Sequence, residues 1–220
     1  MGPGLPERLR AGVLDLFYPR LTCPVCGCFG EGLCPECGSR LRKSQGMVEA
    51  SDADESRIGV SMYLHDEVTT KLINRYKLKS GFNALDVMEK SLTREYLEYI
   101  ATFDLVSFAP SSKASLKRLG FDHGCLLAKA IARRSGVPLI PLFSPPETEQ
   151  KQLDREERKE NVKTITFLQS VVEKGKVPVL EGKRVLIVDD VLTTGSTIDF
   201  CSELVRREGG EPEYLTFSQV

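Results

Sequence analysis

The sequence predicts an α/β protein with a mostly parallel sheet and helices on both faces, preceded by a small N-terminal four-cysteine zinc knuckle. Two observations lead to this prediction. From residue 58 onward, short apolar strand patterns alternate with amphipathic helix patterns, which is typical of a parallel sheet. Five of the seven cysteines fall between Cys23 and Cys37, which indicates a compact metal-binding module. We therefore expect two parts, residues 1–45 and residues 58–220.

The composition is that of an ordinary globular chain. It has 220 residues, 41% of them hydrophobic, and a net charge of −1 from 30 lysines and arginines against 31 acids. This balance argues against a protein that coats nucleic acid with its whole surface, although a local basic groove stays open. The clearest apolar run, residues 185–188, is far shorter than the roughly 18 residues of a membrane span. Because the N-terminus also lacks a signal-peptide pattern, we expect a soluble, cytoplasmic protein without a membrane span.

The first predicted element is an amphipathic helix over residues 5–18, with Pro6 near its start and Pro19 as its stop. Its apolar stripe consists of Leu5, Leu9, Val13, Leu16 and Phe17. Packing against the following domain is favoured over a membrane-surface role because the polar face is not especially basic. Residues 44–57 are polar and acidic with little periodicity, and they predict a linker or an exposed loop.

The second element is the cysteine module, in which Cys23-Pro-Val-Cys26-Gly and Cys34-Pro-Glu-Cys37-Gly repeat one pattern. Each pair places two thiolates on a tight turn, and the following glycine permits a positive φ that directs backbone N–H groups towards sulfur. Four thiolates complete a structural zinc shell with no open position for catalysis. Cys28 could replace Cys26 as a ligand. We prefer Cys26 because it completes the CxxC pair with Cys23. Docking of a protein and contact with nucleic acid both stay open for this knuckle.

The remaining elements follow from apolar runs bounded by turn residues. The strands are expected at 58–64, 105–108, 137–142, 183–188 and 214–219, and the helices at 66–80, 82–101, 121–135 and 196–208. Gly136 and Gly209 are the expected stops of the last two helices.

The segment VLIVDDVLTTGST, residues 185–197, predicts a strand, two adjacent carboxylates and a hydroxyl-rich turn that opens a helix. Backbone N–H groups and four hydroxyls in the turn suit a phosphate at a helix N-terminus, and Gly195 allows close approach of the backbone. Asp189 and Asp190 suit two vicinal ribose hydroxyls and lie where a hard divalent cation would be held. A plain strand with an Asp-Asp cap explains neither the second carboxylate nor the four hydroxyls. The segment therefore predicts a sugar-phosphate cradle.

Five motifs in order resemble the competence protein F (ComF) family of phosphoribosyltransferase-like proteins. They are FYPRLTCPVCG with LCPECGSRL, then NRYKLKSG, APSSKASLKRLGFDHGCLLAKAIA, QKQLDREERKENVK and VLIVDDVLTTGST, and they run from about Phe17 to the C-terminus. The resemblance implies a type I phosphoribosyltransferase-like fold that binds 5-phosphoribosyl-1-pyrophosphate (PRPP) with Mg²⁺.

The resemblance also implies roles for single residues. Asp189 and Asp190 are expected on the ribose diol and near Mg²⁺, and residues 193–197 on the 5-phosphate. The expected PRPP-binding set is Ala109, Pro110, Ser111, Ser112 and Lys113 at the pyrophosphate, Tyr76 and Lys77 beside it, and Asp189, Asp190, Val191, Leu192, Thr193, Thr194, Gly195, Ser196 and Thr197. Zinc is expected on Cys23, Cys26, Cys34 and Cys37. Further charge comes from Lys117, Arg118 and residues 151–163. These residues either supply movable charge near the bound substrate or form a solvated charged face.

One segment departs from the family pattern. Where the family commonly has RGFNQA, residues 119–124 read LGFDHG. A surface helix cap is favoured over catalysis for His123. Catalytic residues stay unknown, because phosphoribosyl transfer needs little beyond positioning and electrostatic stabilisation.

Three functions compete. The first, implied by the family name, is a PRPP-binding protein for DNA uptake in natural transformation, acting at the cytoplasmic side of the inner membrane with competence proteins or single-stranded DNA. The second is a metabolic phosphoribosyltransferase that acts on ammonia or a base. The third is a binding module with a vestigial cradle, against which the intact Asp189, Asp190 and TTGST weigh. The first two use the same cradle, so the sequence does not separate them.

Overall fold

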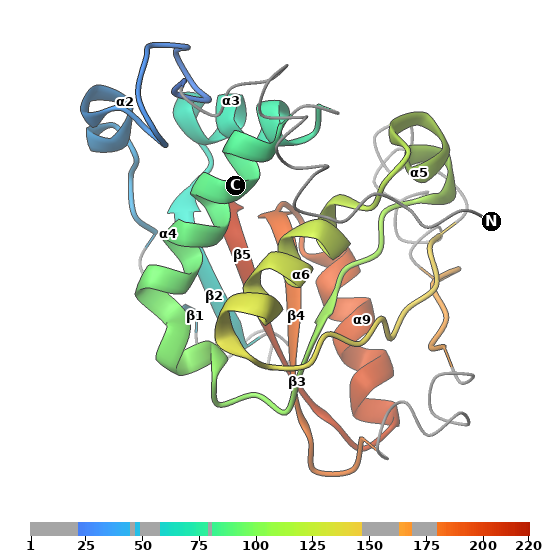
Figure 1. Cartoon of the computed structure of the whole chain (residues 1–220). Coiled ribbons are helices and arrows are strands. Elements are labelled where there is room, and N and C mark those ends of the chain that lie inside the picture. The colour runs from blue at the N-terminus through green and yellow to red at the C-terminus, as the bar shows by residue number, and fades with distance from the viewer. Residues whose placement is uncertain (1–21, 45–46, 49–57, 79–80, 147–162, 169–179) are drawn as a thin grey trace, which may run out of the picture.

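The computed structural model describes residues 22–44, 47–48, 58–78, 81–146, 163–168 and 180–220. The helix predicted over residues 5–18 and the charged segment 151–162 lie outside these residues. The helices are α2 (Pro35–Ser39), α3 (Glu67–Tyr76), α4 (Phe82–Ile100), α5 (Lys113–Leu119), α6 (His123–Ser135) and α9 (Ser196–Arg207). The strands are β1 (Met47–Val48), β2 (Gly59–Leu64), β3 (Leu105–Phe108), β4 (Arg184–Leu192) and β5 (Glu211–Gln219). Figure 1 shows their arrangement.

The sheet has the order β1-β2-β5-β4-β3, and β2, β5, β4 and β3 run parallel to one another. Only the two-residue β1 pairs antiparallel among the described strands. In Figure 1, α4 and α6 lie over one face and α9 over the other. The predicted α/β class with helices on both faces is therefore confirmed.

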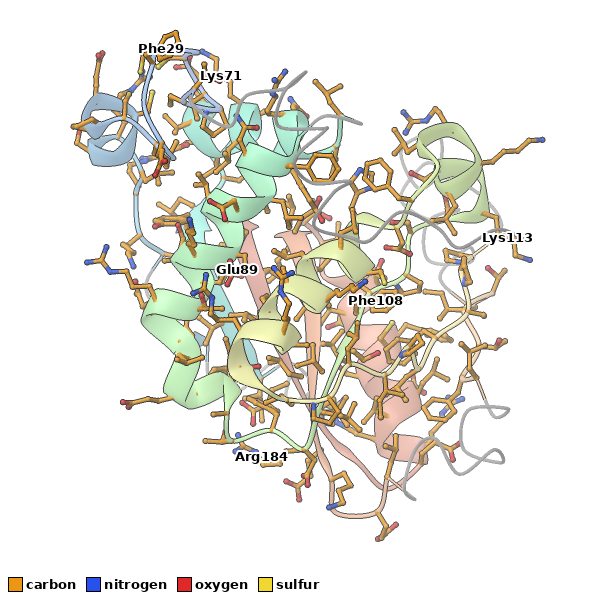
Figure 2. The ribbon with its side chains drawn as sticks, viewed as in Figure 1. Phe29, Lys71, Glu89, Phe108, Lys113 and Arg184 are labelled. Atoms are coloured by element: carbon orange, nitrogen blue, oxygen red, sulfur yellow. The ribbon has the colours of Figure 1, made fainter. Side chains whose placement is uncertain are left out.

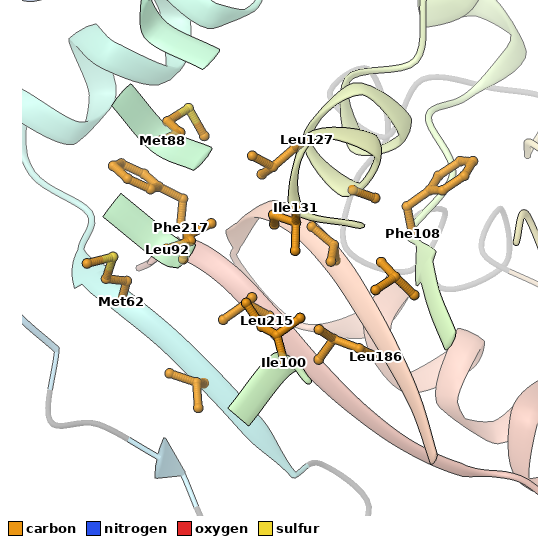
Figure 3. Close-up of a cluster of buried hydrophobic side chains, with 14 of the residues drawn as sticks. Met62, Met88, Leu92, Ile100, Phe108, Leu127, Ile131, Leu186, Leu215 and Phe217 are labelled. Atoms are coloured by element: carbon orange, nitrogen blue, oxygen red, sulfur yellow. The ribbon is translucent and has the colours of Figure 1, made fainter. Parts of the chain in front are cut away.

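The apolar core lies on both faces because successive side chains of each strand point in opposite directions. On β4, Leu186 and Val188 pack under α4 and α6, whereas Val185 and Ile187 pack under α9. Figure 3 shows the first of these clusters. Its labelled members are Met62, Met88, Leu92, Ile100, Phe108, Leu127, Ile131, Leu186, Leu215 and Phe217.

Two differences from the predicted elements help to position the site. Strand β4 continues past residue 188, because Asp189 and Val191 still pair with β5, opposite Thr216 and Ser218. Helix α5 was not predicted; it buries none of its residues and so has no core-facing stripe to reveal it. It begins at a cap, where the Ser115 N–H donates to Ser112 Oγ over 3.1 Å.

The strand predicted at 137–142 is reduced to one bridge, between Leu139 and Val106. The pairing is local: the Val106 N–H donates to the Pro138 carbonyl, and the Ile140 N–H donates to the Val106 carbonyl. Proline at 138 has no N–H to extend a ladder, which accounts for the short pairing.

The cysteine module continues directly into the sheet edge. The Leu64 N–H donates to the Arg42 carbonyl, and the Ser44 N–H donates to the Met62 carbonyl. At the other end of the module, Asn83 Nδ2 donates to the Thr22 carbonyl over 3.1 Å. The division at residues 45–58 stays a prediction. No helix within the described ranges is long and apolar enough to cross a membrane.

Candidate functional site

A cavity of about 600 Å³ lies at the carboxyl ends of β3 and β4. This is where open parallel sheets place their ligand sites. Two stretches, residues 109–112 and 189–198, form much of its lining. The rest comes from Asn74, Lys77, Leu78, Ser115, Arg118, Leu119, His123, Gly124 and Pro146. The fold thus brings together two stretches that the sequence places about 80 residues apart.

Two carboxylates and one ammonium form the charged floor of this cavity. Asp189 Oδ1 accepts a hydrogen bond of 2.8 Å from the Asp190 N–H. Lys77 Nζ lies 2.7 Å from Asp190 Oδ2, an ion pair between the end of α3 and the end of β4. Burial and the neighbouring Asp190 charge raise the pKa of Asp189 well above its ordinary value. Burial opposes the charged form of Lys77, but Asp190 and Asp189 outweigh it and raise the lysine pKa.

The turn between β4 and α9 presents a helix N-terminus to the cavity. Gly195 has φ of +78°, a left-handed conformation that favours glycine, and the Asp199 N–H donates to its carbonyl. Among the described side chains, none caps this helix. Thr194 Oγ1 and Ser196 Oγ share a hydrogen bond of 2.9 Å. The cavity therefore receives hydroxyls and the positive end of a helix dipole together, which suits a phosphate.

The loop after β3 forms the facing wall. Ala109, Pro110, Ser111 and Ser112 line the cavity, as the predicted pyrophosphate loop would require. Lys113 does not line it; this exposed residue begins α5, and Figure 2 labels it at the edge of the molecule, well apart from Phe108 at the end of β3.

The two residues predicted at the end of α3 have different surroundings. Lys77 lines the cavity. The Tyr76 side chain is only 2% exposed, lies outside the lining, and donates its hydroxyl hydrogen bond to the His123 carbonyl. Asn74 and Leu78 also line the cavity but were not among the predicted site residues. Their spacing of four residues in the NRYKLKSG tract places them on the same side of a helix.

His123 is not the surface helix cap that we expected. Its side chain is 5% exposed and packs between two rings, with centroid distances of 5.4 Å to Tyr76 and 4.7 Å to Phe121. Burial lowers its pKa, which favours the neutral imidazole. The cap of α6 is Asp122, which accepts from the Cys125 N–H over 3.1 Å.

The cysteine knuckle forms a second candidate site, at α2. Four sulfur atoms lie within 4.8 Å of one another, as a metal site requires; they belong to Cys23, Cys26, Cys34 and Cys37. Cys26 Sγ and Cys34 Sγ are 3.7 Å apart. A tetrahedron with Zn–S bonds of about 2.3 Å has edges of about 3.8 Å, so this spacing fits a bound metal ion.

The two CxxC turns are built alike but end differently. The Gly27 N–H donates to the Cys23 carbonyl, and the Gly38 N–H donates to the Cys34 carbonyl, each over 2.8 Å. Gly27 has the expected positive φ of 78°, whereas Gly38 does not, because it belongs to α2. The expectation of a positive φ was therefore wrong for the second turn.

Comparison with known proteins places residues 122–213 in the phosphoribosyl transferase domain family. Competence protein ComFC of Bacillus subtilis is 23% identical over 205 residues, which are 90% of this chain and 77% of that protein. Adenine phosphoribosyltransferase of Yersinia pseudotuberculosis is 31% identical over 156 residues, 70% of this chain and 78% of that protein.

Solved structures also match this chain. Orotate phosphoribosyltransferase from Aeropyrum pernix aligns with TM-score 0.39 and 20% identity, over 84% of this chain and 77% of the other. Adenine phosphoribosyltransferase from Thermoanaerobacter pseudethanolicus aligns with TM-score 0.40 and 19% identity, over 84% and 98%. The fold class is established by the parallel sheet and the family match rather than by these scores.

Proposed function

Because this chain belongs to the phosphoribosyltransferase family and resembles ComFC over 90% of its length, we propose that it binds PRPP in the cavity at β3 and β4. One observation carries the proposal. The acidic pair, the hydroxyl-rich turn and the Ala109–Ser112 loop line the same cavity. A ligand with a phosphate at one end, a diol in the middle and a diphosphate at the other end suits these groups: the phosphate at the turn, the diol at the acidic pair and the diphosphate at the loop.

Each group has a chemical role in this proposal. The turn at residues 193–197 binds the 5-phosphate through backbone N–H groups and hydroxyls at the start of α9. The carboxylates of Asp189 and Asp190 accept hydrogen bonds from the ribose hydroxyls. Ser112 lines the same cavity, and its hydroxyl donates to the diphosphate. Lys77 holds Asp190 in place and reduces the negative charge that a polyanion meets.

The acidic pair also suits Mg²⁺. Within the protein, Asp189 uses one oxygen for the Asp190 N–H, and Asp190 uses one for Lys77, so both carboxylates are fixed at the cavity. Mg²⁺ prefers one or two carboxylates together with phosphate oxygens of the substrate. Bound there, it would neutralise charge on the diphosphate.

We also propose that the knuckle holds one structural Zn²⁺ through Cys23, Cys26, Cys34 and Cys37. The support is the mutual distance of the four sulfur atoms. Cys28 lies outside this set of four.

For the biological role, we propose support of DNA uptake during natural transformation, at the cytoplasmic side of the inner membrane. Competence proteins and single-stranded DNA are the proposed partners. The support is the likeness to ComFC, which extends over 205 residues and 90% of this chain.

Transfer of phosphoribose to a base or to ammonia is the second candidate. The adenine phosphoribosyltransferases favour it, but the one compared above matches 70% of this chain against 90% for ComFC. Release of pyrophosphate from PRPP, assayed with ammonia and a panel of bases, separates the two. Turnover with one acceptor supports the enzyme, and binding without turnover supports a PRPP-binding role.

The PRPP site is tested by calorimetric titration with PRPP and Mg²⁺. The Asp189→Asn, Asp190→Asn double variant should bind at least about tenfold more weakly, because charge-assisted hydrogen bonds to the diol and the cation site are lost. The matched control is Asp86→Asn with Glu203→Gln, which removes the same charge from two surface pairs with Lys90 and Arg207. Equal affinity of the acidic-pair variant and wild type would refute the site.

A further inference from the structure

The start of α6 holds the Ala109–Ser112 loop through one side chain, Asp122. Its Oδ1 accepts from the Cys125 N–H and from Ser111 Oγ, each over 3.1 Å. Its Oδ2 accepts from the Ser111 N–H over 3.1 Å. A helix cap needs only one oxygen, so the second oxygen and the bond to the Ser111 hydroxyl are contacts that capping does not explain.

The backbone supports the same loop from the other side. A Cβ atom added to Gly124 would lie 2.6 Å from the Ala109 carbonyl oxygen, so helix and loop touch directly. The start of α6 also holds the end of α3, because Tyr76 donates to the His123 carbonyl and His123 Nε2 lies 3.4 Å from the Lys77 carbonyl. Residues 122–124 therefore join both walls of the cavity.

The charge of Asp122 makes its position informative. A third carboxylate beside Asp189 and Asp190 opposes the binding of an anion, and its charge also raises the pKa of Asp189. Attraction of a phosphate therefore cannot account for an acid here. What the carboxylate offers, and a serine, threonine or asparagine cap does not, is two acceptor oxygens on one planar group.

We propose that Asp122 is a positioning residue that fixes Ser111 so that the loop receives the diphosphate of the ligand. This inference rests on the proposed binding of PRPP. Asp122 does not touch the ligand itself. Asp122 holds both donors of Ser111, the N–H and the hydroxyl, and so fixes the course of the loop whose residues line the cavity. Ordering the loop before binding removes an entropy loss that the ligand would otherwise have to overcome.

The experiment compares PRPP with ribose 5-phosphate, which lacks the diphosphate, by titration with Mg²⁺. The measured quantity is the ratio of their dissociation constants. Asp122→Ala should reduce the preference for PRPP roughly tenfold and leave the affinity for ribose 5-phosphate within twofold of wild type. Asp122→Asn should give an intermediate ratio, because an amide keeps one acceptor oxygen in place of two.

The matched control is Asp66→Ala. Asp66 caps α3 by accepting from the Val68 and Thr69 N–H groups, so its loss removes a cap of the same kind without touching Ser111. This variant should lose thermal stability as Asp122→Ala does, yet keep the wild-type ratio. Hydrogen exchange at the Ser111 amide gives a second readout, and it should accelerate only in the Asp122 variants.

The outcomes are distinguishable. An unchanged ratio in Asp122→Ala, with PRPP binding still lost in the Asp189→Asn, Asp190→Asn variant, overturns the positioning role and leaves the PRPP site standing. A parallel loss of affinity for both ligands would show that Asp122 acts through general stability, and this also overturns it. Failure of the wild-type chain to bind PRPP overturns the proposed function and this inference together.

Discussion

Asp189 lies at the carboxyl end of β4 beside a second carboxylate, and its raised pKa shows that the fold opposes its charge. Such a residue is destabilising before its ligand arrives. A carboxyl whose folded pKa exceeds its unfolded pKa contributes stability that is fully present below the unfolded value of about 4 and is lost as pH rises through the folded pKa. At neutral pH the ligand-free protein therefore holds Asp189 at a cost that binding of a diol or a cation offsets.

The first prediction follows from that sign. Asp189→Asn should raise the melting temperature of the ligand-free protein at pH 7 by roughly 2–4 °C, the shift that about 1 kcal/mol produces in a chain of this size. The gain should shrink as the pH is lowered towards 4, where the wild-type carboxyl is protonated. Thermal unfolding across this pH range measures it, and a variant less stable than wild type at pH 7 would contradict it.

At the scale of elements, we expect the knuckle to depend on the proposed zinc ion. Val25 and Leu33 of the knuckle pack against the main core, and two exposed ion pairs join Arg40 Nη2 to Glu67 Oε2 at 3.0 Å and Arg42 Nε to Asp66 Oδ2 at 3.4 Å. Exposed pairs of this kind stabilise by no more than about 1 kcal/mol each. A zinc ion would also join the two CxxC turns to each other, a link that these contacts do not replace.

The second prediction concerns that metal. Native mass spectrometry should find one zinc ion per chain, and Cys34→Ser should lose the ion and lower the melting temperature. The matched control is Cys28→Ser, which removes an exposed thiol two residues from Cys26 but outside the four-sulfur cluster. Retention of zinc by Cys34→Ser, or its loss in Cys28→Ser, would show that the ligand set is different.

At the scale of the whole molecule, α3 lies between the two candidate sites. Its first residue, Glu67, pairs with Arg40 of the knuckle, and Asn74 near its end lines the cavity beside Lys77. Figure 1 shows α3 next to α2 at the edge of the sheet where the strands end.

The third prediction is that PRPP stabilises the whole fold, because its cavity is lined by β4, α5, α6 and α9 together. With Mg²⁺ and PRPP at 100 times the dissociation constant, the free energy of unfolding should rise by about 2.7 kcal/mol. This corresponds to roughly 5–10 °C in melting temperature. Scanning calorimetry measures it, and the Asp189→Asn, Asp190→Asn variant should show at most about half of this shift under the same conditions, because tenfold weaker binding leaves the ligand at about 10 times its dissociation constant.

The sequence by itself determined most of the strands and helices, the four-cysteine pattern and the turn after β4. These are local features: strand β3 was predicted at its observed bounds because four buried residues end at Ala109-Pro110. Helix α5 was not predicted because none of its seven residues is buried, so it has no apolar stripe. Strand β4 was predicted too short because Asp189 and Asp190 interrupt its apolar run.

Only the tertiary structure decided which of the predicted residues share one cavity. In the folded chain Lys77 pairs with Asp190, and the Tyr76 side chain is buried in the core. Lys113 lies outside the cavity lining, and Ser111 is hydrogen-bonded to Asp122. Lys77 and Asp190 are more than 100 residues apart, and Tyr76 and its partner His123 are 47 residues apart, so no local pattern encodes these contacts. Their physical origin is the parallel sheet, which brings the carboxyl ends of distant strands to one edge and packs α3 and α6 beside them.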